Sequence, residues 1–254
     1  MELLLDAFKV RVSQGKQFVP DVRAANPIGF RGLPVVNDTP CGTGCTGCAD
    51  ACPSTAIQLQ PFGLDLGRCV FCDECSRVCP QDKVQFTAGY RMASRTRDGL
   101  IVREGKQLAP VEASAAIRKI FGRSLKLRSV SAGGCNGCEL EINAMANVNF
   151  DCGRYGIDIV ASPRHADGLI LSGPISANMA EALELCYHGM PDPKFVIAAG
   201  ACAISGGIFD SSPALDRSFL GRFAPDLYVA GCPPHPLSIV NGILDLMGHA
   251  DGTW

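Results

Sequence analysis

Apolar positions change their spacing along this chain, and the N-terminal part shows helical spacing first. A stripe that repeats every three to four residues predicts a helix over residues 1–12. The stripe consists of Leu4, Leu5, Phe8 and Val12. Residues 13–40 are rich in proline and glycine, so we expect an extended, irregular segment there. A further helical pattern spans residues 110–121.

From residue 125 onward, short apolar runs alternate with helical patterns. The runs predict strands at residues 125–130, 157–161, 168–171, 195–198 and 227–230. The helical patterns cover residues 176–187 and 236–247. Such alternation is typical of an α/β fold with a mainly parallel sheet.

Composition and charge narrow the possible functions and environment. The 254 residues carry a net charge of −2 with scattered basic residues, so we expect no nucleic-acid partner. No signal peptide is visible and no stretch approaches the roughly 20 apolar residues of a membrane span, so we expect a cytoplasmic protein. Fourteen cysteines in a reducing compartment indicate metal ligands rather than disulfides.

Eight of the cysteines form two similar runs, each ending in Cys-Pro. The runs are Cys41-x3-Cys45-x2-Cys48-x3-Cys52-Pro53 and Cys69-x2-Cys72-x2-Cys75-x3-Cys79-Pro80. The second matches the bacterial ferredoxin pattern, in which three close thiolates bind one [4Fe–4S] cluster and the fourth binds its neighbour. On that rule the first set is Cys41, Cys45, Cys48 and Cys79, and the second set is Cys52, Cys69, Cys72 and Cys75.

The first run departs from the pattern, because three residues instead of two separate Cys41 from Cys45. Gly42 and Gly44 can form a bulge that keeps Cys41 within reach of the cluster. Two alternatives stay open at this point. One is a site held by only three cysteines, and the other is structural zinc, which also binds four thiolates.

A third set of cysteines is dispersed through the second half of the chain. Cys135, Cys138, Cys202 and Cys232 lie just beyond predicted strands, with glycines beside them. The carboxyl ends of the strands form the ligand-binding edge of an open parallel sheet. Four thiolates gathered there fit a third [4Fe–4S] cluster. The two cysteines left over are expected to pack as small apolar side chains. They are Cys152 and Cys186.

These motifs resemble two subunits of one class of complex. Residues 126–248 are similar to the small subunit of group 4, membrane-bound NiFe hydrogenases such as formate hydrogenlyase, and to the cluster-N2 subunit of respiratory complex I. The matching stretches are GGCNGCELEI (133–142), YGIDIVASPRHAD (155–167), GACAISGGIF (200–209) and AGCPPHP (230–236). Residues 27–88 resemble the two-cluster ferredoxin subunit of the same complexes, with FRGLP (30–34) and RCVFCDECSRVCP (68–80).

The resemblance implies a fusion of two modules that are normally separate chains. Residues 1–30 would form a helix that docks on a membrane partner, followed by an extended segment. Residues 31–90 would form a two-cluster, bacterial ferredoxin-like α+β domain, and residues 91–124 a connector. Residues 125–254 would form the small-subunit domain, with a flavodoxin-like parallel sheet.

By the same resemblance the chain is an electron-transfer subunit with three [4Fe–4S] clusters and no catalytic residue of its own. The active site would lie on a hydrogenase- or complex I-type large subunit. Other electron-transfer and membrane-arm subunits would surround them on the cytoplasmic face of the inner membrane. The spacing of Cys135 and Cys138 favours a hydrogenase, because complex I subunits of this type usually carry adjacent cysteines. The alternatives are a complex I-like quinone or sulfur reductase without nickel, and a free-standing carrier.

Polar residues near the third set each have two interpretations. Glu139 and Glu141 either tune the cluster or occupy the first helical turn, where the helix dipole favours acids. The resemblance places Arg164 and His165 at the interface with the large subunit, where His165 either tunes the cluster or packs. The same choice between tuning and packing applies to His235, which lies between two prolines.

Overall fold

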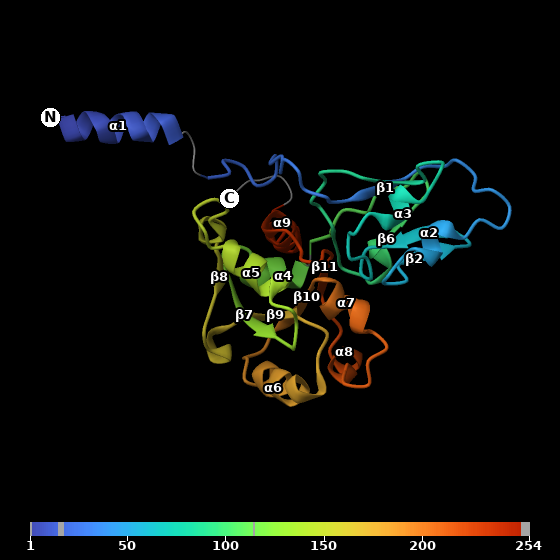
Figure 1. The fold of residues 1–254 in the computed structure, drawn as a ribbon. Coiled ribbons are helices and arrows are strands. Elements are labelled where there is room, and N and C mark those ends of the chain that lie inside the picture. The colour runs from blue at the N-terminus through green and yellow to red at the C-terminus, as the bar shows by residue number, and fades with distance from the viewer. Residues whose placement is uncertain (1, 15–17, 114, 250–254) are drawn as a thin grey trace.

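The second half of the chain forms a six-stranded sheet (Figure 1). The computed structural model describes residues 2–14, 18–113 and 115–249. The strand order across the sheet is β5 (Ala93–Ser94), β11 (Leu227–Val229), β10 (Phe195–Ala199), β9 (Gly168–Ser172), β7 (Leu125–Ser131) and β8 (Ile157–Ile159). All neighbours are parallel except β5 and β11. The predicted, mainly parallel sheet is confirmed, and its five parallel strands have the 2-1-3-4-5 order of flavodoxin-like folds.

Both faces of this sheet are buried. Leu169 and Leu171 of β9 pack into one apolar cluster and Ile170 into the other, as the two-residue period of a strand requires. The first face is covered by α6 (Ala177–His188) and α8 (Ser218–Arg222), and the second by α4 (Ala115–Phe121), α5 (Gly137–Ala144) and α9 (Pro236–Leu246). Because both faces are covered, β9 and β10 are buried along their whole length and are rich in apolar residues.

The cysteine-rich region consists of short antiparallel pairs. Strand β1 (Pro34–Val36) pairs with β4 (Val84–Phe86), and β3 (Phe62–Asp65) lies between β2 (Ile57–Leu59) and β6 (Ile101–Arg103). Helices α2 (Gly47–Asp50) and α3 (Glu74–Arg77) lie within the two cysteine runs. The runs repeat one local structure, because a left-handed residue, Thr55 or Asp82, follows each Cys-Pro and precedes a strand.

The stretch expected to be a connector, residues 91–124, is more structured than that description implies. It supplies β5 to the large sheet and β6 to the small one, with the 3-10 turn η1 (Asp98–Leu100) between them. The predicted helix over residues 110–121 is shorter than expected, since α4 begins at Ala115 and residue 114 lies outside the described residues. Leu108 and Val111 instead pack against the two apolar clusters, which holds this segment extended.

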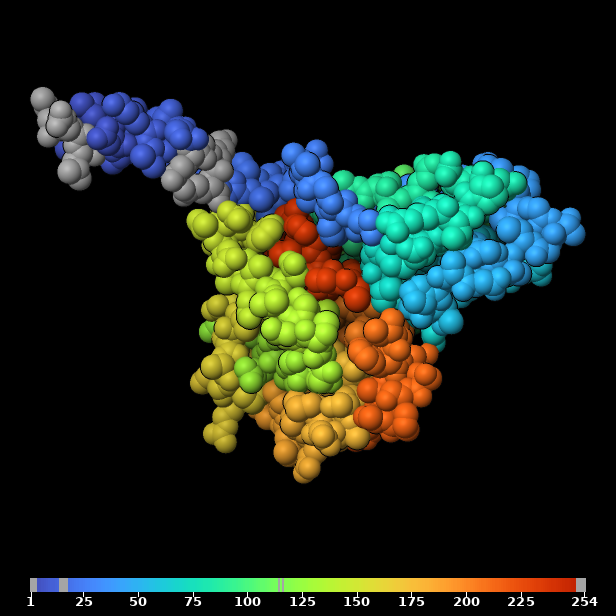
Figure 2. All heavy atoms as spheres, viewed as in Figure 1, coloured from blue at the N-terminus to red at the C-terminus, as the bar shows by residue number. Residues whose placement is uncertain are grey.

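A half-buried ion pair lies where the two parts of the chain meet. Arg97 donates two hydrogen bonds to the carboxylate of Asp65, at 2.7 and 2.6 Å. Arg68, beside Cys69, pairs with Asp210 at 2.9 Å. Gly67 packs so closely that an added Cβ would lie 2.7 Å from the side chain of Ile204. These contacts bring the second cysteine run against α7 (Ala201–Ser205), and Figure 2 shows the two parts in contact.

The predicted N-terminal helix is confirmed as α1 (Glu2–Gln14). It projects away from the rest of the molecule, as the ribbon and the space-filling drawing show from the same direction (Figures 1 and 2). Its apolar side chains are exposed to solvent, with Leu4 77% and Phe8 69% exposed. In the described part of the chain, no helix combines the length and the apolar character needed to cross a bilayer.

Candidate functional site

The third set of cysteines gathers at the carboxyl edge of the parallel sheet. Cys135 and Cys138 follow β7 at the start of α5, Cys202 begins α7 after β10, and Cys232 follows β11. The four line one small cavity of about 70 Å³ together with the loop after β9. This is the edge where the 2-1-3-4-5 order reverses direction, the place where open α/β sheets bind ligands.

The backbone around this cavity is shaped for a bulky group against the sulfurs. Gly200 has a φ of +92°, and a Cβ at this position would lie 2.6 Å from the Cys138 sulfur. A side chain there would therefore displace the thiolate or fill the space beside it. Four converging thiols, glycine-lined backbone and a small cavity fit a [4Fe–4S] cluster, which needs one cysteine on each of four irons.

Three thiols of this set, Cys138, Cys202 and Cys232, have raised pKa values and keep their protons unless a metal replaces them. Burial, followed by the charges of Glu139 and the other three cysteines, raises the pKa of Cys138 to about 12. Burial, with Cys232 and Cys135, raises the pKa of Cys202 to about 11. Since only thiolates bind metal, such crowding of thiols is unfavourable until a cation neutralises them.

The two cysteine runs near the N-terminus also form electrostatic groups. Burial raises the pKa of Cys48, and the neighbouring charges that raise it further are Cys79, Cys41 and Cys45. Burial raises the pKa of Cys69 to about 12, and its cysteine neighbours are Cys75, Cys52 and Cys72. Cys79 therefore lies near the first run and Cys52 near the second, as the ferredoxin rule expects, although Cys75 also interacts with Cys48 of the first run.

Backbone amides point at the sulfurs of both runs. The N–H of Ala56 donates to the Cys52 sulfur at 3.2 Å, and the N–H of Lys83 donates to the Cys79 sulfur at 3.4 Å. Each donor lies four residues beyond its cysteine, so the two cysteine runs share this hydrogen bond as well as their spacing. Amide donors of this kind stabilise the negative charge of cluster sulfurs and tune their potential.

A single metal ion would need a tighter arrangement of ligands. Within residues 2–14, 18–113 and 115–249, no three His, Cys, Asp or Glu side chains are grouped closely enough to hold one metal ion. Tetrahedral zinc requires all four sulfurs at about 2.3 Å from one point. A cubane cluster places its four thiolates on four separate irons and therefore needs a wider cradle.

Glu139 lies in the first turn of α5, directly beside the third set. Its Oε1 accepts a hydrogen bond from the Ser172 hydroxyl at 2.7 Å, and Ser172 is fully buried at the end of β9. Burial by itself would raise the pKa of Glu139, but hydrogen bonds from Ser131 and Ser172 outweigh it, so the pKa is lowered. Burial raises the pKa of Glu141. Glu139 is therefore a fixed negative charge next to Cys138.

Arg164 and His165 do not lie with the cysteines. They belong to the 3-10 turn η3 (Pro163–His165), which precedes β9, and both are exposed. They line a hollow with Lys126, at the amino ends of the strands. This is the opposite edge of the sheet from the third set, so a tuning role for His165 is not supported. A partner seated only on the cysteine edge would not reach them.

His235 acts as a helix cap and a packing residue. Its Nδ1 accepts a hydrogen bond from the N–H of Leu237 at 3.1 Å, at the start of α9. Its ring packs between Phe30 and Phe150, with ring centroids 4.8 and 5.6 Å away. Burial lowers the pKa of His235, which keeps the ring neutral and able to accept this bond.

The two cysteines outside the three sets are part of the apolar packing. Cys152 is buried in the cluster on the α5 and α9 side of the sheet. Cys186 is half-buried on α6 against the other cluster. Burial raises the pKa of both thiols, which agrees with a packing role.

Two cations near the cysteines were not identified from the sequence. Lys83 is buried beside Cys79, and its ammonium contacts the carboxylate of Glu104 at 2.7 Å and the carbonyl of Thr39 at 2.6 Å. Arg217 lies in an irregular segment beyond Cys202 and bonds to the carbonyl of that cysteine. The spacing of Lys83, four residues after a Cys-Pro cysteine, could have drawn attention to it.

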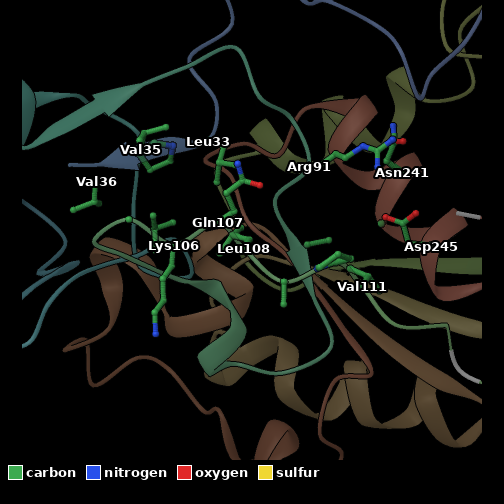
Figure 3. Close-up of a pocket in the computed structure, with 17 residues that line it drawn as sticks. Leu33, Val35, Val36, Arg91, Lys106, Gln107, Leu108, Val111, Asn241 and Asp245 are labelled. Atoms are coloured by element: carbon green, nitrogen blue, oxygen red, sulfur yellow. The ribbon is translucent and has the colours of Figure 1, made fainter. Parts of the chain in front are cut away.

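A larger hollow of about 560 Å³ lies away from all twelve cysteines (Figure 3). It separates β1 from α9 and is closed by residues 105–111. Figure 3 shows Arg91, Asn241 and Asp245 together on one side and Lys106 on the other. No cysteine lines this hollow, so the recognisable chemistry of the chain lies with the grouped thiols instead.

Comparison with known proteins adds to this geometry. The family described as NADH ubiquinone oxidoreductase, 20 Kd subunit, matches residues 135–246, a range that contains the whole third set. Probable membrane-bound hydrogenase subunit mbhJ of Pyrococcus furiosus is 43% identical over 131 residues, which cover 51% of this chain and 78% of that protein.

Two further relatives are matched over a smaller share of their length. Formate hydrogenlyase subunit 7 of Escherichia coli is 39% identical, and the match covers 53% of this chain and 52% of that protein. NAD(P)H-quinone oxidoreductase subunit K 1 of Acaryochloris marina is 43% identical, with 43% of this chain and 47% of that protein covered. The chain thus spans about half the length of these two proteins.

Proposed function

The chain belongs to the NADH ubiquinone oxidoreductase 20 Kd subunit family, and we propose that it is an electron-transfer subunit carrying three [4Fe–4S] clusters. It would serve a membrane-bound complex of the NiFe-hydrogenase type, with the active site on a partner large subunit. Its first half would be a ferredoxin-like module fused to the family domain. Bound clusters would supply one-electron transfer, and the chain's own residues hold and insulate them.

The observation that carries this proposal is that cysteines expected to share a cluster lie near one another. The neighbours of Cys48, Cys69 and Cys138 are in each case the three other members of the set expected to share a cluster. Four protein thiolates per cluster is the usual complement of a cubane. A catalytic chain would require a further reactive site, and the strong motifs of this sequence supply only thiolates.

The contacts between the two parts favour a relay through the second set. Arg68 precedes Cys69 and also bonds to Thr55, close to Cys52, while its other nitrogen pairs with Asp210. Gly67 packs on Ile204, two residues from Cys202. The second set would therefore be the neighbour of the third. Cys41 and Cys45 of the first set are exposed and would form the outer end, facing a donor or acceptor.

A complex I-like quinone or sulfur reductase without nickel remains the alternative. The family includes relatives from both kinds of complex, and their identities to this chain are equal at 43%. The spacing of Cys135 and Cys138 favours the hydrogenase. The large subunit encoded with this chain would decide, since two CxxC pairs there would hold nickel.

The test is an iron and sulfide assay on the full chain purified without oxygen. The native chain should hold about twelve irons, by the rule of four thiolates per four irons. Cys202→Ser should lose about four of them, and Cys75→Ser should lose about four from the other part. Cys186→Ser is the matched control and should keep all of them. The EPR signal lost in Cys202→Ser defines the third site.

Several outcomes would contradict the proposal. About eight irons in the native chain would mean that one set is empty, with Cys41 the first suspect because of its unusual spacing. Stoichiometric zinc in place of iron would remove electron transfer altogether. Hydrogen uptake by the isolated chain, in a preparation free of nickel, would show that it is catalytic.

A further inference from the structure

Arg217 is a half-buried cation beside the third set. Its guanidinium donates to the carbonyls of Pro174 at 2.9 Å, Cys202 at 3.0 Å and Ala203 at 2.9 Å. Pro174 follows β9, whereas Cys202 and Ala203 follow β10. One side chain therefore ties two adjacent loops at the carboxyl edge of the sheet, one of which carries a proposed cluster ligand.

The charge of Arg217 is not neutralised by an ion pair. Over the residues that the structure describes, no carboxylate forms a salt bridge with Arg217. Asp210 interacts with it electrostatically at longer range but forms its salt bridge with Arg68. Its partners are carbonyl oxygens, which orient the guanidinium without cancelling its charge. Arginine stays protonated in proteins, so this is a permanent positive charge.

Lys83 provides an internal contrast. It lies beside Cys79 just as Arg217 lies beside Cys202, but its ammonium is paired with the carboxylate of Glu104 at 2.7 Å. The pair has no net charge, so its effect on a nearby cluster is small. The charge of Arg217, by contrast, is unpaired by any carboxylate among the described residues, and its guanidinium bonds directly to the carbonyls of Cys202 and Ala203.

We propose that Arg217 is a positioning residue of the third site whose charge raises the reduction potential of the cluster held there. The inference rests on the proposed function, since it requires a cluster at Cys135, Cys138, Cys202 and Cys232. Reduction adds one negative charge to the cluster, and a fixed cation beside it stabilises that charge. Arg217 is half-buried and held by three carbonyls, so water screens its charge less than that of an exposed arginine.

The test compares Arg217→Gln with Arg217→Lys in the full chain. Glutamine keeps hydrogen-bonding capacity and removes the charge, whereas lysine keeps the charge and loses the two-pronged contact with the carbonyls. The matched control is Arg222→Gln, which removes an arginine of α8 that pairs with Glu184 on the surface. The readout is the midpoint potential of the third-site EPR signal, with iron content measured on the same samples.

Arg217→Gln should weaken the electron affinity of the third site at least tenfold, which lowers its midpoint by about 59 mV for one electron. Arg217→Lys and Arg222→Gln should stay close to the native midpoint, and the other signals should not move. Loss of the third cluster from Arg217→Gln but not from Arg217→Lys would also support a role for the positive charge. Both variants lose the paired hydrogen bonds of the guanidinium, so only the charge distinguishes them. Equal behaviour of the two Arg217 variants, in potential or in iron loss, would overturn the inference. A native chain with no third-site iron would instead refute the proposed function.

Discussion

The two halves of this molecule hold their cysteines by different means. The strands β2, β4 and β6 of the cysteine-rich part have three residues each, and the core there includes Cys48, Cys69 and Cys75. In the sheet domain, β7 has seven residues, and β9 and β10 have five each and are buried along their whole length. The sheet domain can therefore form its site from apolar packing, whereas the first part depends on whatever its thiols bind.

The largest effect that tests this contrast is removal of iron. Stripping iron with a chelator under anaerobic conditions should abolish protection from hydrogen exchange across residues 37–86, because thiols with raised pKa values stay protonated and leave no cross-link. Residues of β7, β9 and β10 should keep their protection, because one face of their sheet packs into the second apolar cluster, which contains no proposed ligand. Hydrogen exchange read by mass spectrometry distinguishes the two regions.

Restoring iron and sulfide is the control for this experiment, and it should return protection to residues 37–86. If the amides of β9 exchanged as fast as those of α2 and α3 after iron removal, the two halves would be one cooperative unit. The contrast drawn from their cores would then be wrong.

A smaller effect should follow from breaking the contact between the halves. Asp65→Asn removes the partner of Arg97, whose side chain is 31% exposed, while that of Asp65 is 9% exposed. Leaving a mostly buried guanidinium unpaired should cost about 2–4 kcal/mol of stability. The midpoint of thermal unfolding should fall by about 5–15 °C, measured by circular dichroism.

The matched control is Asp98→Asn, one residue from Arg97. Asp98 is exposed, and its substitution should change stability by less than about 0.5 kcal/mol. Equal midpoints for the two variants would mean that the Asp65–Arg97 pair does not hold the halves together.

The smallest predicted effect concerns pH and His235. Burial lowers the pKa of this ring, so the unfolded chain takes up the proton at a higher pH than the folded chain does. Stability should therefore be unaffected above about pH 6.5 and should fall below it by at most about 1.4 kcal/mol per pH unit. His235→Asn keeps a capping side chain without the titration.

Thermal midpoints at pH 7.5 and pH 5.5 measure this effect. The native chain should lose more stability on acidification than His235→Asn does, even if the variant is weaker at both pH values because its contacts with Phe30 and Phe150 are lost. Identical differences between the two pH values would assign the acid sensitivity to other groups.

Much of the fold could be predicted from the sequence because its signals are local. The strands at β7, β9, β10 and β11 were each predicted to within two residues at both ends. The apolar runs of β9 and β10 are buried on both faces, whereas in β7 the buried leucines alternate with Lys126 and Arg128. The helix before β7 was predicted too long, because contacts of Leu108 and Val111 with distant apolar clusters override the helical pattern. Strands β5 and β6 were missed because each is short and formed by pairing with a distant partner.

The sequence by itself determined which cysteines could share a metal site, because ligand spacing and strand-end position are properties of the chain. Only the tertiary structure decided what surrounds those sites. In the folded chain Arg217 bonds to the carbonyl of Cys202, and Ser172 donates to Glu139. Arg164 and His165 lie at the amino ends of the strands, on the opposite side of the sheet from the cysteines. The physical reason is that a ligand motif depends on a few neighbouring residues, whereas the charged residues around a site belong to distant segments. These segments come into contact only when the sheet folds.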